Sequence, residues 1–144
     1  MRNEKNTFIR VGMLLFFLFQ CINLSAQNPR ISSVERESKD YLLTKLLLNN
    51  DDLKANFIRL NDELEFIIEP KVTQIYKYNL DVLAKKGIVS IKILDENGSI
   101  VEFIEVNEVK KLDEIFSKEL QANKKYRLLI KGEKFKGKIN LIWK

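Results

Sequence analysis

The chain contains no histidine, and this absence limits the chemistry that its other side chains can perform. Without an imidazole there is no Ser-His-Asp triad, no Cys-His pair, no histidine metal ligand and no side chain whose ordinary pKa lies near neutrality. Paired carboxylates could still support a glycosidase mechanism. With 20 acidic residues among 144, however, such pairs arise by chance. The sequence therefore predicts that the chain is not an enzyme and has no catalytic residue, and it leaves the binding residues unknown.

Two acidic stretches resemble fragments of a calcium-binding loop, Asp51-Asp52 and residues 95–98 (Asp-Glu-Asn-Gly). Neither continues into the spaced Asp/Asn residues and distal Glu that such a loop requires. The second stretch instead has the Asp and Gly that a type I turn favours at its first and fourth positions. We therefore predict no metal ligand, no cofactor and no cofactor-binding residue, and we expect a hairpin turn at residues 95–98.

The first 26 residues have the layout of a secretory signal peptide. Three basic residues precede the apolar run of residues 11–19, and small residues follow up to Ala26. This pattern predicts export and cleavage after Ala26. The expected location is the periplasm, the cell surface or the exterior.

Two other interpretations of this segment remain open but are less favoured. A retained membrane anchor needs about 20 mostly apolar residues, and Gln20 and Asn23 interrupt the run before that length. Lipid attachment at Cys21 would need small residues where Phe19 and Gln20 stand. Whether the signal is cleaved or retained is therefore a question for experiment.

Cleavage would leave residues 27–144, a length that suits one domain. The single cysteine would leave with the signal, so the remaining chain could form no internal disulfide. Its 22 basic and 19 acidic residues give a net charge of +3, against +5 for the full chain, and the two signs are interspersed. This pattern is typical of a solvated surface, so we expect a soluble mature domain without a nucleic-acid partner. The oligomeric state is left open.

Alternating apolar residues predict an antiparallel β-sandwich of about seven to eight strands. The clearest hairpin joins residues 87–94 to residues 99–106, in a register that pairs Leu94 with Ile100 and Ile91 with Phe103. Further strands are expected at residues 76–82, 126–130 and 139–143, with residues 84–87 as a turn and residues 132–137 as the connection of a terminal hairpin. Another hairpin is expected where residues 57–60 and 64–68 flank residues 61–63, with Pro70 closing it.

Two segments do not follow this alternation. Residues 33–48 have a serine cap, early acids and a spacing of apolar residues that favour a helix. Residues 109–120 fit either a helix or a strand. The expected organisation is thus a signal peptide at 1–26, an N-terminal segment with one helix at 27–55, and a β-sandwich domain at 56–144.

Five motifs follow one another between Tyr76 and Trp143. They are Tyr76-Lys-Tyr78, Gly87, the turn at 95–98, Leu120 to Tyr126, and Gly137 to Trp143. This run resembles the small Ig-like or jelly-roll-like β-sandwich modules of exported bacterial proteins. The resemblance implies a strand at residues 115–120 and a recognition role, and it brings no catalytic residues. Asn123 stands near a position where those modules carry glycine, and Asn also tolerates the left-handed conformation.

Most aromatic residues are expected in the core because they alternate beside aliphatic residues. These are Tyr76, Tyr78, Phe103, Tyr126 and Trp143. Phe135 has two interpretations, a plug over the end of the sandwich or a ring used in an interaction. The sequence does not show which face of the sheets is exposed.

The leading functional hypothesis is a noncatalytic exported module that binds, or has a structural role with, a protein or a cell-envelope component. The alternative is a small inhibitor or immunity-type protein that blocks a partner protein. An enzyme with paired carboxylates is a third class, and it would need a cleft in which two acids converge.

Overall fold

The computed structural model describes residues 27–34, 40–49, 52–108 and 110–144. The predicted signal peptide lies outside these residues. The described chain forms a single eight-stranded antiparallel sheet. Its strands are β1 (Arg30–Ser33), β2 (Tyr41–Leu48), β3 (Asp52–Leu60), β4 (Glu63–Glu69), β5 (Gln74–Leu94), β6 (Ile100–Val106), β7 (Lys111–Leu120) and β8 (Tyr126–Trp143).

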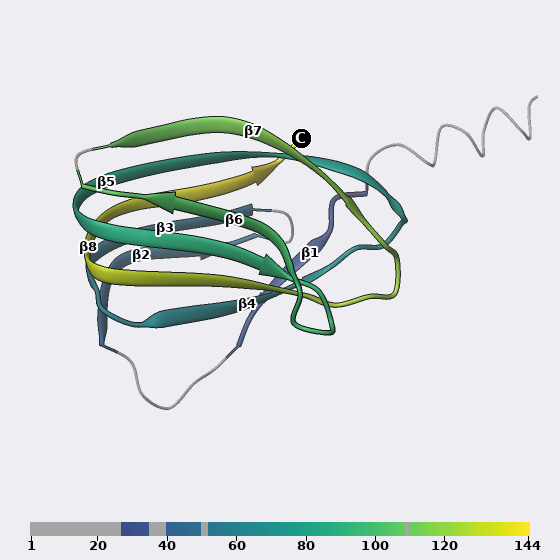
Figure 1. The fold of residues 1–144 in the computed structure, drawn as a ribbon, viewed down its shortest axis with the longest axis horizontal. Helices are drawn as coiled ribbons and strands as arrows, with labels where there is room; N and C mark the ends of the chain where they lie inside the picture. The colour runs from purple at the N-terminus through teal and green to yellow at the C-terminus, as the bar shows by residue number, and fades with distance from the viewer. Residues whose placement is uncertain (1–26, 35–39, 50–51, 109) are drawn as a thin grey trace, which may run out of the picture.

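The sheet doubles over on itself so that its two halves form facing layers (Figure 1). The first layer has the order β7, β5, β8, β3 and β2, and it uses residues 74–84 of β5 and 137–143 of β8. The second layer has the order β6, β5, β8, β4 and β1, and it uses residues 88–94 of β5 and 126–133 of β8. The predicted mainly β, antiparallel sandwich is confirmed.

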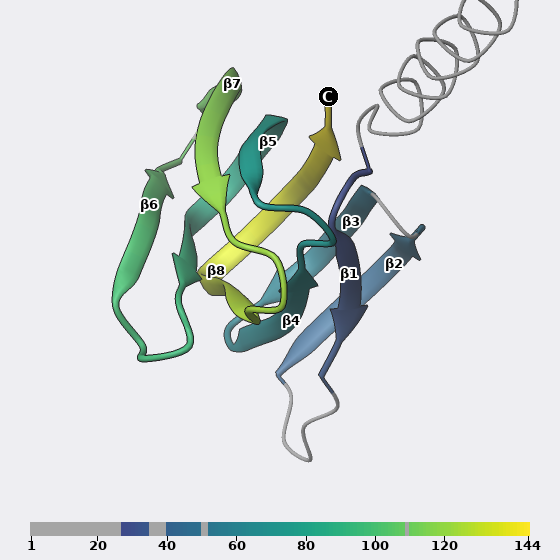
Figure 2. The ribbon, with the colours of Figure 1, turned by 90° about the vertical axis from the view of Figure 1, so that its right-hand side faces the viewer.

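Strands β5 and β8 pass through both layers and bend at the same end of the molecule (Figures 1 and 2). Across the bend the buried positions change from even to odd residue numbers, for example from Tyr78 to Ile91 in β5 and from Leu128 to Ile139 in β8. Irregular pairing between Ala84 and Ile88 marks the place of this change in β5. Such bulges bend a strand and re-aim its side chains, so both halves of each strand point into one interior.

The interior is filled by apolar side chains from both layers, and the only tryptophan is among them. The ring of Trp143 packs edge-on against Tyr78, with centroids 5.3 Å apart, and Tyr78 stacks on Phe116 at 5.5 Å. Tyr76 and Tyr126 are also buried, as predicted. The prediction for Phe103 is wrong, because its side chain is 49% exposed. Of the two interpretations of Phe135, the structure confirms the plug, because this ring is 0% exposed.

The helix predicted over residues 33–48 is wrong for the described part of that segment, because Tyr41–Leu48 is strand β2. β2 is the edge strand of the first layer. Tyr41 and Leu43 pack against the core, while Leu42 is exposed. Apolar residues on both sides of an edge strand hide the period of two, which is why the sequence favoured a helix. Within the described ranges, no helix is long and apolar enough to cross a membrane.

Two predicted hairpins are also wrong. Residues 61 and 62 join β3 to β4, but these strands do not pair with each other, since each pairs with β8 in a different layer. Residues 132–137 are the bend inside β8, and residues 84–87 are the matching bend inside β5. A polar segment with glycine can either reverse a chain or bend it into the next layer, and local composition does not separate the two.

The hairpin turn at residues 95–98 is confirmed. Asp95 Oδ1 accepts hydrogen bonds from the backbone N–H groups of Asn97 at 2.9 Å and Ser99 at 2.8 Å. The N–H of Gly98 donates to the carbonyl of Asp95, and Gly98 has φ +81°. The turn therefore uses Asp95 as a local acceptor, and glycine supplies the left-handed position.

The register beyond this turn differs from the predicted one. Leu94 pairs with Ile100 as expected, but a bulge follows, so Lys92 faces Phe103 and Ile93 faces Glu102. Both apparent mismatches have partners. Lys92 Nζ lies 5.5 Å from the centroid of the Phe103 ring, and Glu102 lies 3.7 Å from Lys118 of β7 in the other layer. The predicted register considered only pairs within this hairpin, so it did not take these two contacts into account.

The segment at residues 109–120 contains strand β7, in agreement with the resemblance. Asn123 has φ +62° in the following turn, which is the left-handed conformation expected of it. The Tyr126 hydroxyl accepts a hydrogen bond from the N–H of Gln121 at 3.0 Å and closes the turn.

Tyr78 gives the protein a predictable response to alkaline pH. Its side chain is 1% exposed, and its hydroxyl has no hydrogen-bond partner among the described residues. Burial, and secondarily the charge of Glu102, raise the pKa of Tyr78 above its ordinary value. Below pH about 10 the residue is protonated in both the folded and unfolded states, whereas above it the unfolded state ionises first.

The free energy of unfolding should therefore fall above pH about 10, and Tyr78 should contribute up to about 1.4 kcal/mol per pH unit. We expect Tyr78→Phe to make this decline shallower. At pH 7 it should change stability little, since the lost hydroxyl has no partner. Urea unfolding at pH 8 and pH 11 measures both effects. Equal declines in the wild type and the variant would contradict the prediction.

Candidate binding face

The outer face of the first layer carries a row of polar side chains that strand register brings together. Lys45 of β2 pairs with Asn56 of β3, and Asn56 pairs with Lys138 of β8. Residues directly opposite each other in neighbouring strands lie on the same side of a sheet. The two lysines therefore flank one asparagine. Lys54 and Asn140 form a similar pair two residues further along the same strands.

These side chains surround a hollow of about 220 Å³, which we call the lysine hollow. It is lined by Lys45, Lys54, Ala55, Asn56, Lys138 and Asn140, so none of the described residues in its wall is acidic. Lys54 Nζ lies 3.6 Å from the carboxylate of Asp52. Neither Lys45 nor Lys138 forms an ion pair with another residue in the described ranges. The hollow therefore presents positive charge that the described protein does not neutralise locally.

Hydrogen-bonded Asn and Asp side chains continue the polar surface toward β7. Asn140 Nδ2 donates to Asp81 Oδ2 at 3.2 Å, and Asn79 Nδ2 donates to Asp113 Oδ1 at 3.2 Å. A carboxylate has room for several hydrogen bonds, and an amide both donates and accepts. These positioned groups can bind ligand hydroxyls beside the lysines.

A second hollow, of about 530 Å³, lies closer to the bend of β5 and β8 and is called the corner hollow here. Its walls are Tyr41, Leu42, Ile58, Arg59, Asn61, Lys86, Lys134, Phe135 and Lys136. Ile58 and Lys136 each stand two residues from a wall residue of the lysine hollow, so the hollows adjoin. Arg59 pairs with Asp40 at 2.9 Å, outside the lining. We call the two hollows together the lysine track.

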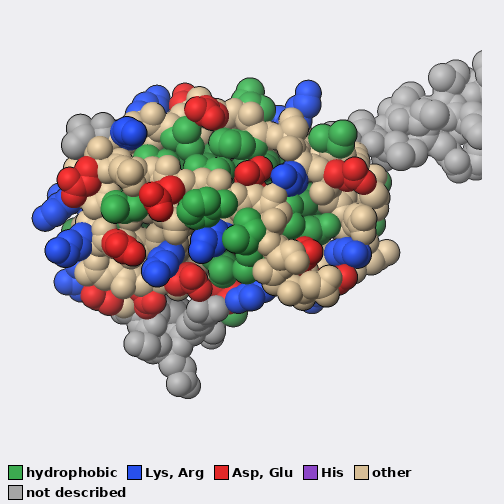
Figure 3. Space-filling view, viewed as in Figure 1, with side chains coloured by type: hydrophobic (Ala, Val, Ile, Leu, Met, Phe, Trp, Pro, Cys, Tyr) green, Lys and Arg blue, Asp and Glu red, His purple; other side chains and the backbone are tan. Residues whose placement is uncertain are grey.

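The outer face of the second layer has a different charge arrangement. Arg127 Nε donates to Glu65 Oε1 at 2.6 Å, and this hydrogen bond raises the pKa of Arg127. Lys125 pairs with Glu69 at 3.1 Å. Figure 3 shows basic and acidic side chains interspersed on this side of the molecule. Arg127 and Lys125 on this face are therefore each paired with an acid within the protein.

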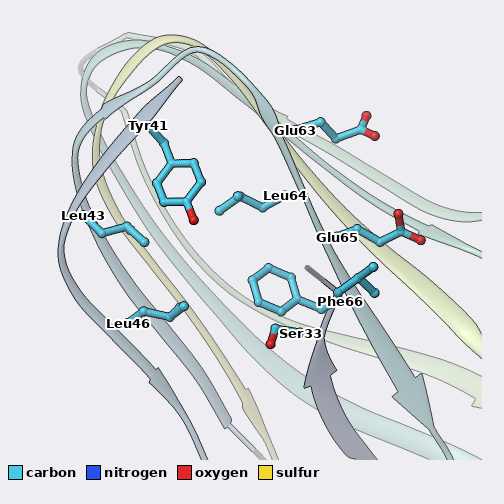
Figure 4. A pocket seen from close by; sticks show the side chains of 9 residues that line it. Ser33, Tyr41, Leu43, Leu46, Glu63, Leu64, Glu65 and Phe66 are labelled. Carbon is cyan, nitrogen blue, oxygen red and sulfur yellow. The ribbon is translucent and has the colours of Figure 1, made fainter. Parts of the chain in front are cut away.

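A small gap of about 50 Å³ opens between the edges of the two layers. Figure 4 shows Tyr41, Leu43 and Leu64 pointing into it, while Glu63 and Glu65 point away. The two carboxylates do not converge on this space. A carboxylate mechanism therefore has no support at this gap.

Within the described residues, the acidic stretches noted in the sequence make local structural contacts. The stretch at 95–98 forms the hairpin turn, and Asp52 pairs with Lys54. Asp51 lies outside the described residues. Across the part of the chain that is described, no three His, Cys, Asp or Glu residues are grouped so that they could hold a metal ion.

The sequence did not reveal the lysine track. Its lysines are separated by up to 93 positions, from Lys45 to Lys138, and long-range strand pairing brings them together. The only local signal is the alternation of Lys134, Lys136 and Lys138, which places three lysines at every second position.

Comparisons with known proteins leave the family of this chain open. No family model and no curated protein matches the sequence. Among solved structures, a carbohydrate-binding module from Cellvibrio mixtus lichenase 5A in complex with cellotriose is 15% identical, with a TM-score of 0.43, and the alignment covers 77% of this chain and 87% of that chain. TmCBM61 in complex with β-1,4-galactotriose is also 15% identical, with a TM-score of 0.42 and coverages of 79% and 83%. Scores this low define neither the fold nor the ligand of the present chain.

Proposed function

We propose that this chain is a noncatalytic exported binding module that recognises a cell-envelope component through the lysine track. The observation that carries the proposal is a pair of adjoining hollows on one sheet face whose described walls contain no acidic side chain. Ligand sites are concave and hold a few convergent polar groups. Lys45 and Lys138 have no acidic partner within the described ranges, so an external ligand can supply the missing negative charge at this place.

The absence of a catalytic role is inferred from the positions of the carboxylates. Glu63 and Glu65 both point away from the gap between the layers (Figure 4). Asp81 and Asp113, which lie on the same face as the lysine hollow, each accept a hydrogen bond from an asparagine. This arrangement supports binding without turnover.

Export is supported by the sequence of residues 1–26. N-terminal sequencing of the native protein tests it. A new terminus at Gln27 is the expected result. Retention of Met1 would favour a membrane anchor and would place the module at the membrane face.

The binding role is tested by sedimenting the purified chain with washed envelopes from the same cells. We compare the wild type with Lys45→Glu/Lys138→Glu, which reverses two charges in the lysine hollow. The control, Lys71→Glu/Lys131→Glu, makes the same change in net charge outside the track. Loss of sedimentation in the first double variant alone supports the proposal. A wild type that stays in solution, or equal behaviour of both double variants, contradicts it.

An inhibitor or immunity-type role is the second candidate, and one observation favours it. Ile100 is 61% exposed and Phe103 is 49% exposed on β6, where a partner protein could cover them. In that case, Phe103→Ala would release a single tightly bound protein, and the lysine variants would keep it.

A further inference from the structure

We infer that the ligand of the lysine track is an acidic polysaccharide, with its anionic groups over Lys45 and Lys138 and its hydroxyls on the neighbouring Asn and Asp side chains. This assignment rests on the binding role proposed above and adds the chemical class of the ligand. Three features of the track support it: the spacing of its unpaired cations, the groups between them, and the backbone at Lys134.

The spacing follows from the sheet itself. Lys45, Asn56 and Lys138 occupy one row across three adjacent strands. Neighbouring strands lie about 4.8 Å apart, so the backbones of the two lysines are about 10 Å apart with an amide between them. Both side chains are exposed and lack an acidic partner in the described chain. A polymer with repeated anionic groups can place one such group over each of the two cations.

The groups beside the cations favour a ligand that also carries hydroxyls. Asn140 and Asp81 are hydrogen-bonded to each other on this face, and Asn79 and Asp113 form a second such pair. Amide and carboxylate oxygens accept hydrogen bonds from hydroxyl groups, and amide N–H groups donate to them. The lysine hollow lacks an aromatic wall residue for base stacking, which is the usual way of holding single-stranded nucleic acid.

Lys134 provides an independent observation in the corner hollow. Its φ is +52°, in the left-handed region that favours glycine. Its backbone N–H donates to Asn61 Oδ1 at 2.6 Å, which helps to hold this conformation. Residues kept in such strained conformations cluster at functional sites. Glycine would adopt this backbone conformation more easily, but lysine at this position adds a cation to the track.

The test measures binding of the purified full chain to two forms of one polymer. Polygalacturonate carries a carboxylate on each sugar, and its fully methyl-esterified form has the same backbone without the charge. Duplex DNA and phosphatidylglycerol vesicles are tested as competing polyanions. The variants are Lys45→Gln/Lys138→Gln in the track, the matched control Lys71→Gln/Lys131→Gln, and Lys134→Gly.

We expect the wild type to bind polygalacturonate at least about tenfold more tightly than the esterified polymer, because each charge-assisted contact contributes substantially. The track double variant should lose about tenfold in affinity or more, and the control should lose little. Lys134→Gly should bind more weakly without a lower melting temperature, which separates loss of charge from loss of folding. Added salt should weaken the binding.

Several outcomes would overturn the inference. Equal binding of both polymers with no effect of the lysine variants would exclude anion recognition, and so would failure to bind polygalacturonate. Binding of DNA or vesicles as tight as that of polygalacturonate would show an unselective basic surface. If any of these occurs while the chain still sediments with envelopes, the inference fails and the binding role stands. If sedimentation is also absent, the proposed function fails.

Discussion

Replacing Gly87 by alanine should cost more than about 4 kcal/mol of unfolding free energy, or prevent folding. Gly87 lies in the bend of β5 with φ +72°, and an added Cβ would overlap the backbone carbonyl groups of Glu133 and Lys134 in the bend of β8. Those atoms belong to a backbone that is itself fixed by pairing on both sides, from Lys136 to Gly132. A loss this large is exceptional for one methyl group, and it is a large part of the total stability of a small domain.

Gly98→Ala is the matched control for this prediction. Gly98 also has a positive φ, +81°, but a Cβ there would meet nothing within 4 Å. Its replacement should lower the free energy of unfolding only by the cost of holding alanine in a left-handed backbone conformation, about 1–2 kcal/mol. The difference between the two variants in urea unfolding therefore measures the close approach of the two bends. Equal losses would show that β5 and β8 do not approach each other as the structure has them.

The sequence predicted those elements whose determinants are local. The turn at 95–98 needed only an Asp acceptor and a Gly with positive φ, and both are present. The alternation at residues 76–82 and 139–143 placed apolar side chains correctly toward the core. Period-two patterns are strong signals when one face of a strand is buried.

The bends of β5 and β8 could not be predicted because they change the phase of that alternation. In β8 the buried positions shift from even to odd numbers across residues 132–137. A phase shift across a polar segment with two glycines has the same pattern as two strands joined by a turn. Only pairing with β3 in one layer and β4 in the other distinguishes a bend from a reversal.

The candidate site was out of reach for a related reason. The sequence shows lysines and acids interspersed, which is typical of a solvated surface. Register separates these charges in space: Lys45 and Lys138 face Asn56, while Glu65 and Arg127 meet on the opposite layer. The net charge of the domain therefore could not indicate a basic face, because the distribution of charge between the two faces depends on how the strands pair.

Phe135→Ala should destabilise the protein by about 3–5 kcal/mol, the range for a large buried aromatic side chain. Its ring is 0% exposed and meets Phe57 edge-on with centroids 5.9 Å apart. It fills the end of the interior where β8 bends between the layers, so its removal leaves a cavity that the bent backbone cannot readily close.

Phe103→Ala is the control that makes this prediction specific, because it removes the same side chain from an exposed position on β6. We expect it to cost about 0.5–1 kcal/mol, the value of an exposed contact with Lys92. The two phenylalanines differ in burial, since Phe135 is 0% exposed and Phe103 is 49% exposed. Urea unfolding of the two variants compares the plug with the surface ring directly. Similar losses of unfolding free energy in both variants would contradict the burial of Phe135. A small loss in Phe135→Ala would favour the other interpretation of this ring, a role in an interaction.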